Sequence, residues 1–191
     1  MPNLNIAELL AVSEIAGQCD RTDALNISGI SFDTRSIKTG ELFTALHGKD
    51  IDGHQFVSDA FAKGAAGALV EKKWIKGNPD VPNDGVLFVV EDSLKALQQL
   101  AVNRRKKLNI PVIGITGTNG KTTTKELTAA VLSRKLNVCK NPGNYNNHLG
   151  VPLSVLQTEP YHDVLIIEMG ANHPGEIAFL SNIESFDIFK I

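Results

Sequence analysis

The feature that most constrains the fold is a segment in the middle of the chain, residues 111–125, which reads PVIGITGTNGKTTTK. Its apolar start is typical of a buried strand, and the glycines that follow predict a tight loop. From Lys121 onward the sequence has helical periodicity. A strand, a glycine-rich loop and a helix in this order predict an α/β fold with a mainly parallel sheet.

The same loop has the composition of a phosphate-binding site. Glycines allow backbone N–H groups to turn toward an anion, and the helix N-terminus adds about half a positive charge. Lys121 could reach the β- and γ-phosphates of a nucleotide, and the Thr122 hydroxyl could bind Mg²⁺. Ile115 stands where the strict P-loop pattern has glycine, so the loop is a variant of that pattern. The alternative interpretation is an ordinary glycine turn beside a capped helix. The sequence contains no guanine-recognition pattern (Asn/Thr-Lys-x-Asp), which favours ATP.

Composition and charge exclude several classes of protein. The 191 residues carry 19 basic and 21 acidic side chains, for a net charge of −2, and no basic stripe suggests nucleic-acid binding. No apolar stretch approaches the ~20 residues that cross a bilayer, and the N-terminus does not read as a signal peptide. Cys19 and Cys139 lie far apart, which fits two unreactive thiols in a reducing compartment. We therefore expect a cytoplasmic protein without membrane insertion.

The first half of the chain reads as a small α/β domain. Apolar residues recur at near-helical spacing over 6–15 and again over 56–64, which predicts two helices. The stretch 76–85 is polar and rich in turn-forming residues, and predicts a surface loop before a domain boundary. We expect a first domain at residues 1–85 and a nucleotide-binding domain at 86–191. Short β-type runs lie at 29–32, 42–46 and 68–70.

The second half reads as part of a doubly wound sheet. Residues 86–90 form a candidate strand, and Asp92 or Ser93 is placed to cap a helix after it. The run at 163–168 is almost continuously apolar, which is typical of a parallel strand covered by helices on both sides. Residues 181–191 read as the start of another strand with no further sheet. We therefore expect an incomplete sheet and a fragment of a longer enzyme.

Glu168 is the second strong candidate for chemistry. It ends the apolar run at 163–168, and ligands of open α/β sheets bind beyond the carboxyl ends of the strands. A carboxylate at this edge, close to Thr122, could hold Mg²⁺ directly or through water. The alternative is a strand-end glutamate that is merely solvated.

A third candidate is the polar loop at 143–152, which should follow a strand at 137–140. Asn144, Asn146 and Asn147 could orient a carboxylate or phosphate without adding charge. Asparagine-rich turns are also common without any function. His54 and His148 are possible general bases and His173 a possible ligand, although lone histidines are more often structural or exposed.

These segments together resemble the Mur ligase family over nearly the whole chain, up to about Asn182. Three blocks in the second half match the family's pattern in the same order. A pattern in the first half resembles the family's UDP-binding domain. The blocks are GITGTNGKTTTKE at 114–126, GNYNNHLGVPL at 143–153 and EMGANHPGEI at 168–177, with DTRS at 33–36, GELFTAL at 40–46 and DGHQF at 52–56.

The resemblance implies an ATP- and Mg²⁺-dependent ligase of peptidoglycan precursors. The γ-phosphoryl group of ATP would pass to the carboxylate of a UDP-N-acetylmuramoyl tripeptide, and the amine of D-Ala-D-Ala would attack the acyl phosphate. The Met-Gly-Ala-Asn-His element after Glu168 favours these substrates over the neighbouring reaction, in which the third peptide residue is added to a UDP-muramoyl dipeptide.

The resemblance also implies roles for individual residues. The family pattern continues with further metal-site residues and a C-terminal domain, so this chain alone is expected to be inactive. The full-length enzyme is expected to be monomeric. The implied roles are catalysis by Lys121, Glu168 and Asn144, metal binding by Thr122 and Glu168, ATP binding by Gly114, Thr116, Gly117, Thr118, Asn119, Gly120, Lys121, Thr122 and Thr123, and substrate binding by Thr34, Arg35, Asp52, His54, Asn146 and Asn147.

Other functions remain open on the sequence alone. Another Mur-type ligase would share the first-half pattern, and folylpolyglutamate synthetase shares only the ATP loop. A P-loop kinase for a small molecule would account for the loop and Glu168 but not for the blocks at 33–36 and 52–56. A non-catalytic module that binds a UDP-sugar is a third possibility.

Overall fold

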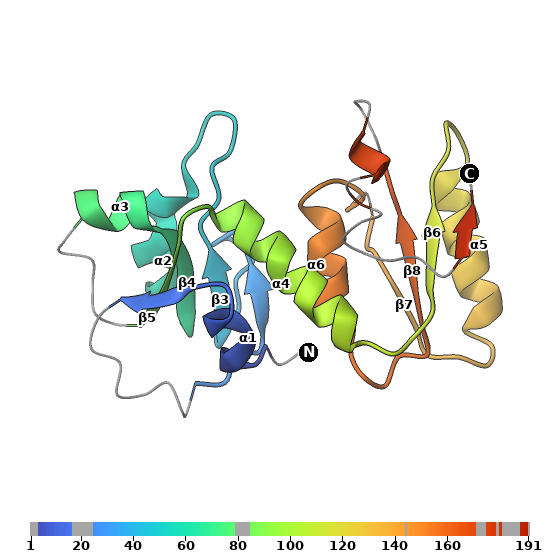
Figure 1. Cartoon of the computed structure of the whole chain (residues 1–191), viewed down its shortest axis with the longest axis horizontal. Coiled ribbons are helices and arrows are strands. Elements are labelled where there is room, and N and C mark those ends of the chain that lie inside the picture. Colours follow the sequence, from blue (N-terminus) through green and yellow to red (C-terminus); the bar gives the residue numbers. More distant parts are fainter. Residues whose placement is uncertain are drawn as a thin grey trace. The chain divides into compact units, whose positions relative to one another are not determined.

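The computed structural model describes residues 4–16, 25–78, 85–143, 145–170, 175–178, 180 and 188–190. The chain divides into two compact units, Met1–Leu97 and Gln98–Ile191, each built on its own sheet (Figure 1). The α/β class and the mainly parallel sheets expected from the sequence are confirmed. Among the described residues, no helix combines the length and the apolar character needed to cross a membrane.

The first unit is built on a five-stranded sheet with the order β1-β5-β4-β3-β2. Four of its strands run parallel, and β1 pairs antiparallel with β5 at one edge. The strands are β1 (Glu14–Ala16), β2 (Gly29–Ser31), β3 (Glu41–Thr44), β4 (Gly67–Glu71) and β5 (Val86–Val90). The helices are α1 (Ile6–Leu10), the 3₁₀ helix η2 (Gly53–Phe56), α2 (Val57–Ala62) and α3 (Lys72–Gly77).

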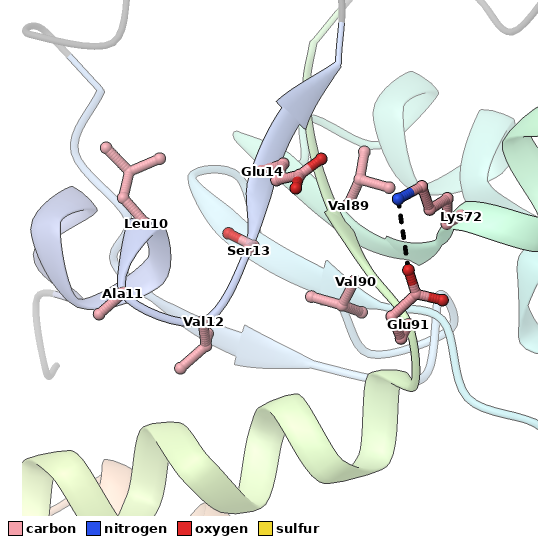
Figure 2. Close-up of a pocket in the computed structure, with 9 residues that line it drawn as sticks. All are labelled: Leu10, Ala11, Val12, Ser13, Glu14, Lys72, Val89, Val90 and Glu91. Carbon is pink, nitrogen blue, oxygen red and sulfur yellow. Dashed lines mark ion pairs between the residues drawn. The ribbon is translucent and has the colours of Figure 1, made fainter.

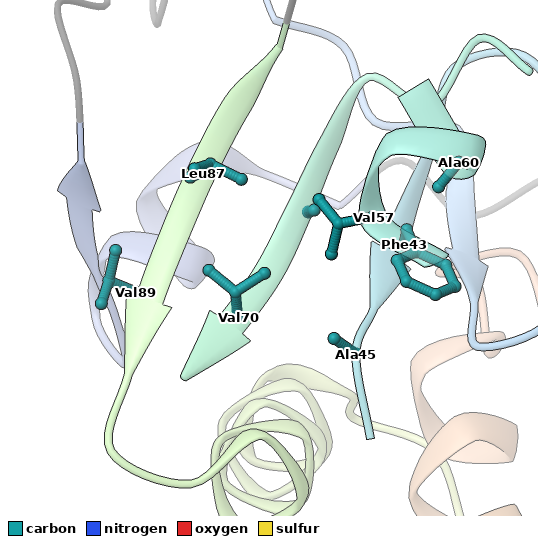
Figure 3. Close-up of a cluster of buried hydrophobic side chains, with 8 residues drawn as sticks. Phe43, Ala45, Val57, Ala60, Val70, Leu87 and Val89 are labelled. Carbon is teal, nitrogen blue, oxygen red and sulfur yellow. The ribbon is translucent and has the colours of Figure 1, made fainter. Parts of the chain in front are cut away.

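One face of this sheet is covered by α2 and carries a buried apolar cluster (Figure 3). Burying one valine, leucine or phenylalanine side chain stabilises a fold by about 1.5–3 kcal/mol. The cluster therefore holds the three central strands in register and fixes the loops that leave their carboxyl ends. Its members are Phe43, Ala45, Val57, Ala60, Ala68, Val70, Leu87 and Val89.

Two details of the first unit differ from the sequence-based expectation. The opening helix ends at Leu10, and Ile15 belongs to β1, where it pairs with Phe88. In addition, β5 lies in the first sheet beside β4, whereas a boundary at residue 85 assigns this strand to the second domain. Both differences arise because strand pairing is a long-range contact that local periodicity does not report.

The second unit contains a four-stranded, fully parallel sheet with the order β7-β8-β6-β9. Every residue of β8 is buried, as expected for a strand with helices over both faces. Figure 1 shows α5 and α6 on opposite sides of this sheet. The elements are α4 (Ser93–Lys107), which begins in the first unit, β6 (Val112–Ile115), α5 (Lys121–Leu132), β7 (Val138–Lys140), α6 (Gly150–Leu156), β8 (Val164–Glu168) and β9 (Ile188–Lys190).

Candidate functional site

The predicted strand, loop and helix around Lys121 are present as β6, residues 116–120 and α5. Gly120 precedes the helix with φ of 74°, and Gly117 has φ of 144°, so both glycines use backbone conformations that side chains disfavour. Gly120 has no side chain, so α5 begins without a side-chain hydrogen bond from its N-cap residue. This arrangement suits an anion at the start of α5.

Lys121 lies across the glycine-rich loop that it follows. Its Nζ donates to the carbonyl oxygen of Gly117 at 2.7 Å and to that of Thr118 at 3.5 Å. The ammonium group is thus held next to the backbone that would surround a phosphate. Its long, flexible stem allows the charge to move from these carbonyls to a bound phosphate.

Glu168 is the centre of the site in the second unit. It ends β8 and is only 2% exposed, which rules out a merely solvated strand-end carboxylate. Its Oε2 accepts a hydrogen bond from Thr122 Oγ1 at 2.9 Å, and its Oε1 accepts one from Asn146 Nδ2 at 2.9 Å. Three segments that are distant in sequence therefore meet at one buried carboxylate.

Two residues that the sequence analysis did not single out complete this cluster. Lys125 Nζ lies 3.5 Å from Glu168 Oε2, and its side chain is fully buried. Asn141 is also fully buried; its side chain accepts from the backbone N–H of Glu168 and donates to the carbonyl oxygens of Glu168 and Tyr145. The available signal for Lys125 is its position three residues after Thr122, which places both side chains on one face of a helix.

The polar loop after β7 has separate roles for its asparagines. Asn146 contacts Glu168, while Asn147 Oδ1 accepts from the backbone N–H groups of Leu149 and Gly150 and so caps α6. Asn144 lies outside the described residues, as does His173. The ATP-binding candidates all lie on the 114–123 segment. Thr122 of this segment is brought together with Glu168, which also contacts Asn146.

In the first unit, the predicted substrate-binding residues Thr34 and Arg35 follow the end of β2. Arg35 makes a two-pronged ion pair with Asp33, with Nη2 to Oδ2 at 2.6 Å, and its side chain is 88% exposed. Hydrogen bonds from the Arg35 side chain and backbone lower the pKa of Asp33 to about 2. Thr34 is buried, and its carbonyl oxygen accepts from Lys63 Nζ, which ties this turn to the end of α2.

Asp52 and His54 belong to a hydrogen-bonded network at the carboxyl ends of β3 and β4. The Nε2 of His54 accepts from the backbone N–H of Glu71, so the ring proton is on Nδ1, which donates to Asp52 Oδ1 at 2.6 Å. Burial raises the pKa of Asp52, but the hydrogen bonds from the backbone and ring of His54 outweigh it and lower that pKa below its usual range. His47 also lies between two carboxylates, with Nε2 at 3.0 Å from Glu71 and Nδ1 at 3.4 Å from Asp52.

His47, Asp52 and His54 are close enough to suggest a metal centre, but their hydrogen bonds argue against one. Binding a metal through Nδ1 of His54 would require the proton to move to Nε2, where it would face the N–H of Glu71. The network therefore holds the loop at 47–54 against the end of β4.

A cleft of about 290 Å³ in the first unit is separate from these clusters (Figure 2). It is lined by residues 10–14, 72 and 89–91, and contains none of the residues predicted from the sequence. Lys72 and Glu91 form an ion pair of 3.3 Å across part of its wall. Because these two charged groups pair with each other, the cleft offers a ligand less free charge than its composition suggests.

Comparisons with known proteins agree with this geometry. Residues 26–105 match a model described as the Mur ligase family, catalytic domain, and residues 115–190 match the Mur ligase middle domain. A UDP-N-acetylmuramoyl-tripeptide–D-alanyl-D-alanine ligase from Synechocystis sp. is 44% identical over 162 residues, which is 85% of this chain and 35% of the relative.

Two solved structures are similar to the chain as well. A crystal structure of MurF from Acinetobacter baumannii matches with a TM-score of 0.86 and 32% identity, covering 99% of this chain and 40% of that one. MurF ligase from Thermotoga maritima in complex with ADP matches with a TM-score of 0.69 and 35% identity, covering 81% of this chain and 35% of that one. The chain thus spans about two fifths or less of the length of these relatives. Because the two family models together account for most of its residues, the chain belongs to the Mur ligase family.

Proposed function

We propose that the chain provides the nucleotide-binding and UDP-substrate-binding parts of a ligase that joins D-Ala-D-Ala to a UDP-N-acetylmuramoyl tripeptide. The observation that carries the proposal is the buried Glu168 carboxylate, which meets Thr122 of the phosphate loop and Asn146 of the polar loop. The relatives that bear this activity in their names support the choice of substrates. We also propose a cytoplasmic location and a monomeric full-length enzyme.

ATP would bind with its phosphates on the 114–123 segment. The N–H groups at the start of α5 and the Lys121 ammonium would neutralise phosphoryl charge. The structure of the Thermotoga maritima relative in complex with ADP supports nucleotide binding in this family. ATP rather than ADP is required by the chemistry, because the carboxylate has to be activated by a phosphoryl group.

Thr122 and Glu168 offer oxygen atoms at a spacing that suits Mg²⁺. Magnesium prefers oxygen ligands at about 2.0–2.1 Å in an octahedron, so adjacent ligands lie about 2.9 Å apart. The Oγ1 of Thr122 and the Oε2 of Glu168 are separated by 2.9 Å. These two residues would hold the ion, which would supply charge neutralisation at the β- and γ-phosphates.

The residues of the chain then position the reactants. Lys121 would stabilise the charge of the phosphoryl group as it passes to the tripeptide carboxylate, and Asn146 would orient the acyl phosphate beside Glu168. Attack by the D-Ala-D-Ala amine forms a tetrahedral intermediate, and its collapse releases phosphate and leaves the new amide. Asn144 and Asn147 remain predictions for this cleft.

The UDP end of the substrate would bind to the first unit. Arg35 is the candidate with the most accessible hydrogen-bond donors, since its side chain is largely exposed. His54 has both ring nitrogens engaged, so we infer that it would act by holding Asp52 in place. Thr34 would act in a similar way, through the turn that presents Arg35.

The test is phosphate release by the full-length reading frame with ATP, Mg²⁺, UDP-N-acetylmuramoyl tripeptide and D-Ala-D-Ala, each omitted in turn. A requirement for all four supports the ligase. Release without the dipeptide, with no acyl phosphate trapped by hydroxylamine, would instead indicate a kinase or an ATPase. Replacing Lys121 by Ala should abolish ATP binding and leave binding of the UDP ligand unchanged.

A further inference from the structure

We propose that Lys125 is a positioning residue, which holds the start of the polar loop, at residues 141–143, and the Glu168 carboxylate in register with helix α5. This role rests on the proposed function and goes beyond it, because Lys125 would act on the reaction without touching the nucleotide. It is distinct from Lys121, whose ammonium group lies over the phosphate loop itself.

The contacts of Lys125 join three segments of the second unit. Its Nζ donates to the carbonyl oxygen of Asn141 at 3.0 Å and to that of Gly143 at 3.0 Å. It also lies 3.5 Å from Glu168 Oε2 and 3.8 Å from Glu126 Oε1. The ammonium group of α5 is therefore bonded to the start of the polar loop and paired with the carboxylate at the end of β8.

Burial makes these contacts consequential. Lys125 is fully buried, and a cation in such a place is costly unless it is paired and hydrogen-bonded. A side chain needed only to fill space there could be apolar, since replacing buried charges by apolar groups is often neutral or stabilising. A lysine that bonds to the carbonyl oxygens of Asn141 and Gly143 and pairs with Glu168 instead fixes the relative position of those three groups.

The loop that Lys125 holds carries Asn146 to the site. Asn146 donates to Glu168 Oε1, and its carbonyl oxygen accepts from the backbone N–H of Gly170 at 2.8 Å. Asn146 thus contacts one oxygen of the Glu168 carboxylate, and Lys125 lies near the other, Oε2. Thr122 also donates to Oε2. Loss of the lysine would free the beginning of the loop and let Asn146 and Glu168 drift from the phosphate position.

The test compares two variants of Lys125 in the full-length reading frame. Lys125→Met removes both the charge and the donors, whereas Lys125→Gln keeps donors for the loop carbonyls. We expect Lys125→Met to lower kcat on the order of 100-fold, as small misplacements of reacting groups do, with little change in KM for ATP. Lys125→Gln should retain more activity. Lys135→Met, the same change at an exposed lysine beyond α5, should leave kcat unchanged.

A double-mutant cycle separates positioning from a general loss of structure. If Lys125 acts through the loop, the losses caused by Lys125→Gln and Asn146→Ala should be less than multiplicative, because the second change removes what the first misplaces. Multiplicative losses would overturn the proposal, as would a raised KM for ATP at unchanged kcat, which would indicate direct nucleotide contact. If Lys125→Met unfolds at the assay temperature, the cycle with Lys125→Gln still decides.

A second readout does not depend on ligase activity. Amide hydrogen exchange in the 191-residue chain should be faster for peptides covering 141–150 in Lys125→Gln than in Lys135→Met, with the α5 peptides unchanged. Equal exchange in the two variants would refute the role of Lys125. Inactivity of the unmodified enzyme with all four reactants, together with faster exchange in Lys125→Gln, would refute the proposed function alone.

Discussion

Thr122 and Glu168 are 46 positions apart in sequence, and the hydroxyl of the first donates to the carboxylate of the second over 2.9 Å. The contact joins the first turn of α5 to the end of the buried strand β8. It places two oxygen atoms at the spacing of neighbouring ligands around Mg²⁺.

Replacing Glu168 by Gln should remove most of the Mg²⁺ dependence of nucleotide binding. The amide keeps the shape of the side chain but lacks the negative charge that attracts the ion. Loss of such a charged group should also lower kcat of the full-length enzyme by about 10²–10³-fold. Calorimetric titration of the chain with ADP, with and without Mg²⁺, measures the first effect. The control is Glu91→Gln, which changes an exposed side chain of the first unit. If Mg²⁺ still increased the affinity of Glu168→Gln for ADP as much as in the unmodified chain, the metal role of Glu168 would be excluded.

Replacing Gly170 by Ala should impair catalysis more than stability. A Cβ at this position would lie 3.0 Å from both Cγ and Oδ1 of Asn146, so the amide that bonds to Glu168 would have to shift. We expect kcat to fall about tenfold, as for a modest displacement of a positioning group, and the melting temperature to change little. Gly77→Ala is a matched control, because a Cβ there meets no atom within 4 Å. Equal kcat values for the two variants would show that the position of Asn146 does not matter.

His54 should be a stabilising residue of the first unit, and His47 should not. His54→Leu leaves Asp52 and the N–H of Glu71 without their present partner, which should cost about 2–3 kcal/mol of unfolding free energy. His47 is 56% exposed, so His47→Ala should cost less than about 1 kcal/mol. Urea unfolding followed by fluorescence of Trp74, whose ring centroid lies 5.5 Å from that of His54, reports on this unit. Similar losses in both variants would contradict the structural role of His54.

The ion pair of Asp33 and Arg35 should contribute to stability only above acid pH. The pKa of Asp33 is lowered from 3.8 to about 2 in the folded chain, because Arg35 bonds to its charged form. A carboxyl with a depressed folded-state pKa stabilises the fold above its unfolded pKa, and the contribution is lost as the pH falls from about 4 to about 2.

Replacing Arg35 by Met should therefore raise the pKa of Asp33 toward 3.8, the value of a carboxyl without such a partner. Carboxyl chemical shifts followed by NMR between pH 2 and pH 5 (approximate limits that span both values) measure this change directly. Arg134→Met removes an exposed arginine in the second unit and should leave Asp33 unaffected. A pKa of Asp33 that stays near 2 in Arg35→Met would mean that other groups stabilise its charge.

Much of the site was predictable because its signals are local. The strand, the glycine loop and the helix at Lys121 occupy consecutive residues, and their order follows from backbone preferences and periodicity alone. Glu168 was identifiable for the same reason, since an apolar run that ends in a carboxylate marks the edge of a parallel sheet. The family resemblance rested on these same short blocks.

Periodicity also showed that α5 is a helix, but the face that it buries came only from the tertiary structure. Leu127 and Val131 lie one turn apart and are 63% and 71% exposed, while Lys125 and Ala129 are buried. Hydrophobicity alone predicts the reverse, with Leu127 and Val131 buried and Lys125 exposed, because a lysine is seldom buried without a partner. Its partners are the carbonyl oxygens of Asn141 and Gly143, which follow another strand.

The amino-acid sequence by itself thus determined the class of fold, the glycine-rich loop before α5 and the residues that end the strands beside it. The tertiary structure decided which of those residues meet: β5 joins the first sheet, His54 bonds to the backbone of Glu71, and Lys125 reaches Glu168. The physical reason is that backbone preference and periodicity act over a few neighbouring residues, whereas strand order and buried polar pairs depend on contacts between segments that only the folded chain brings together.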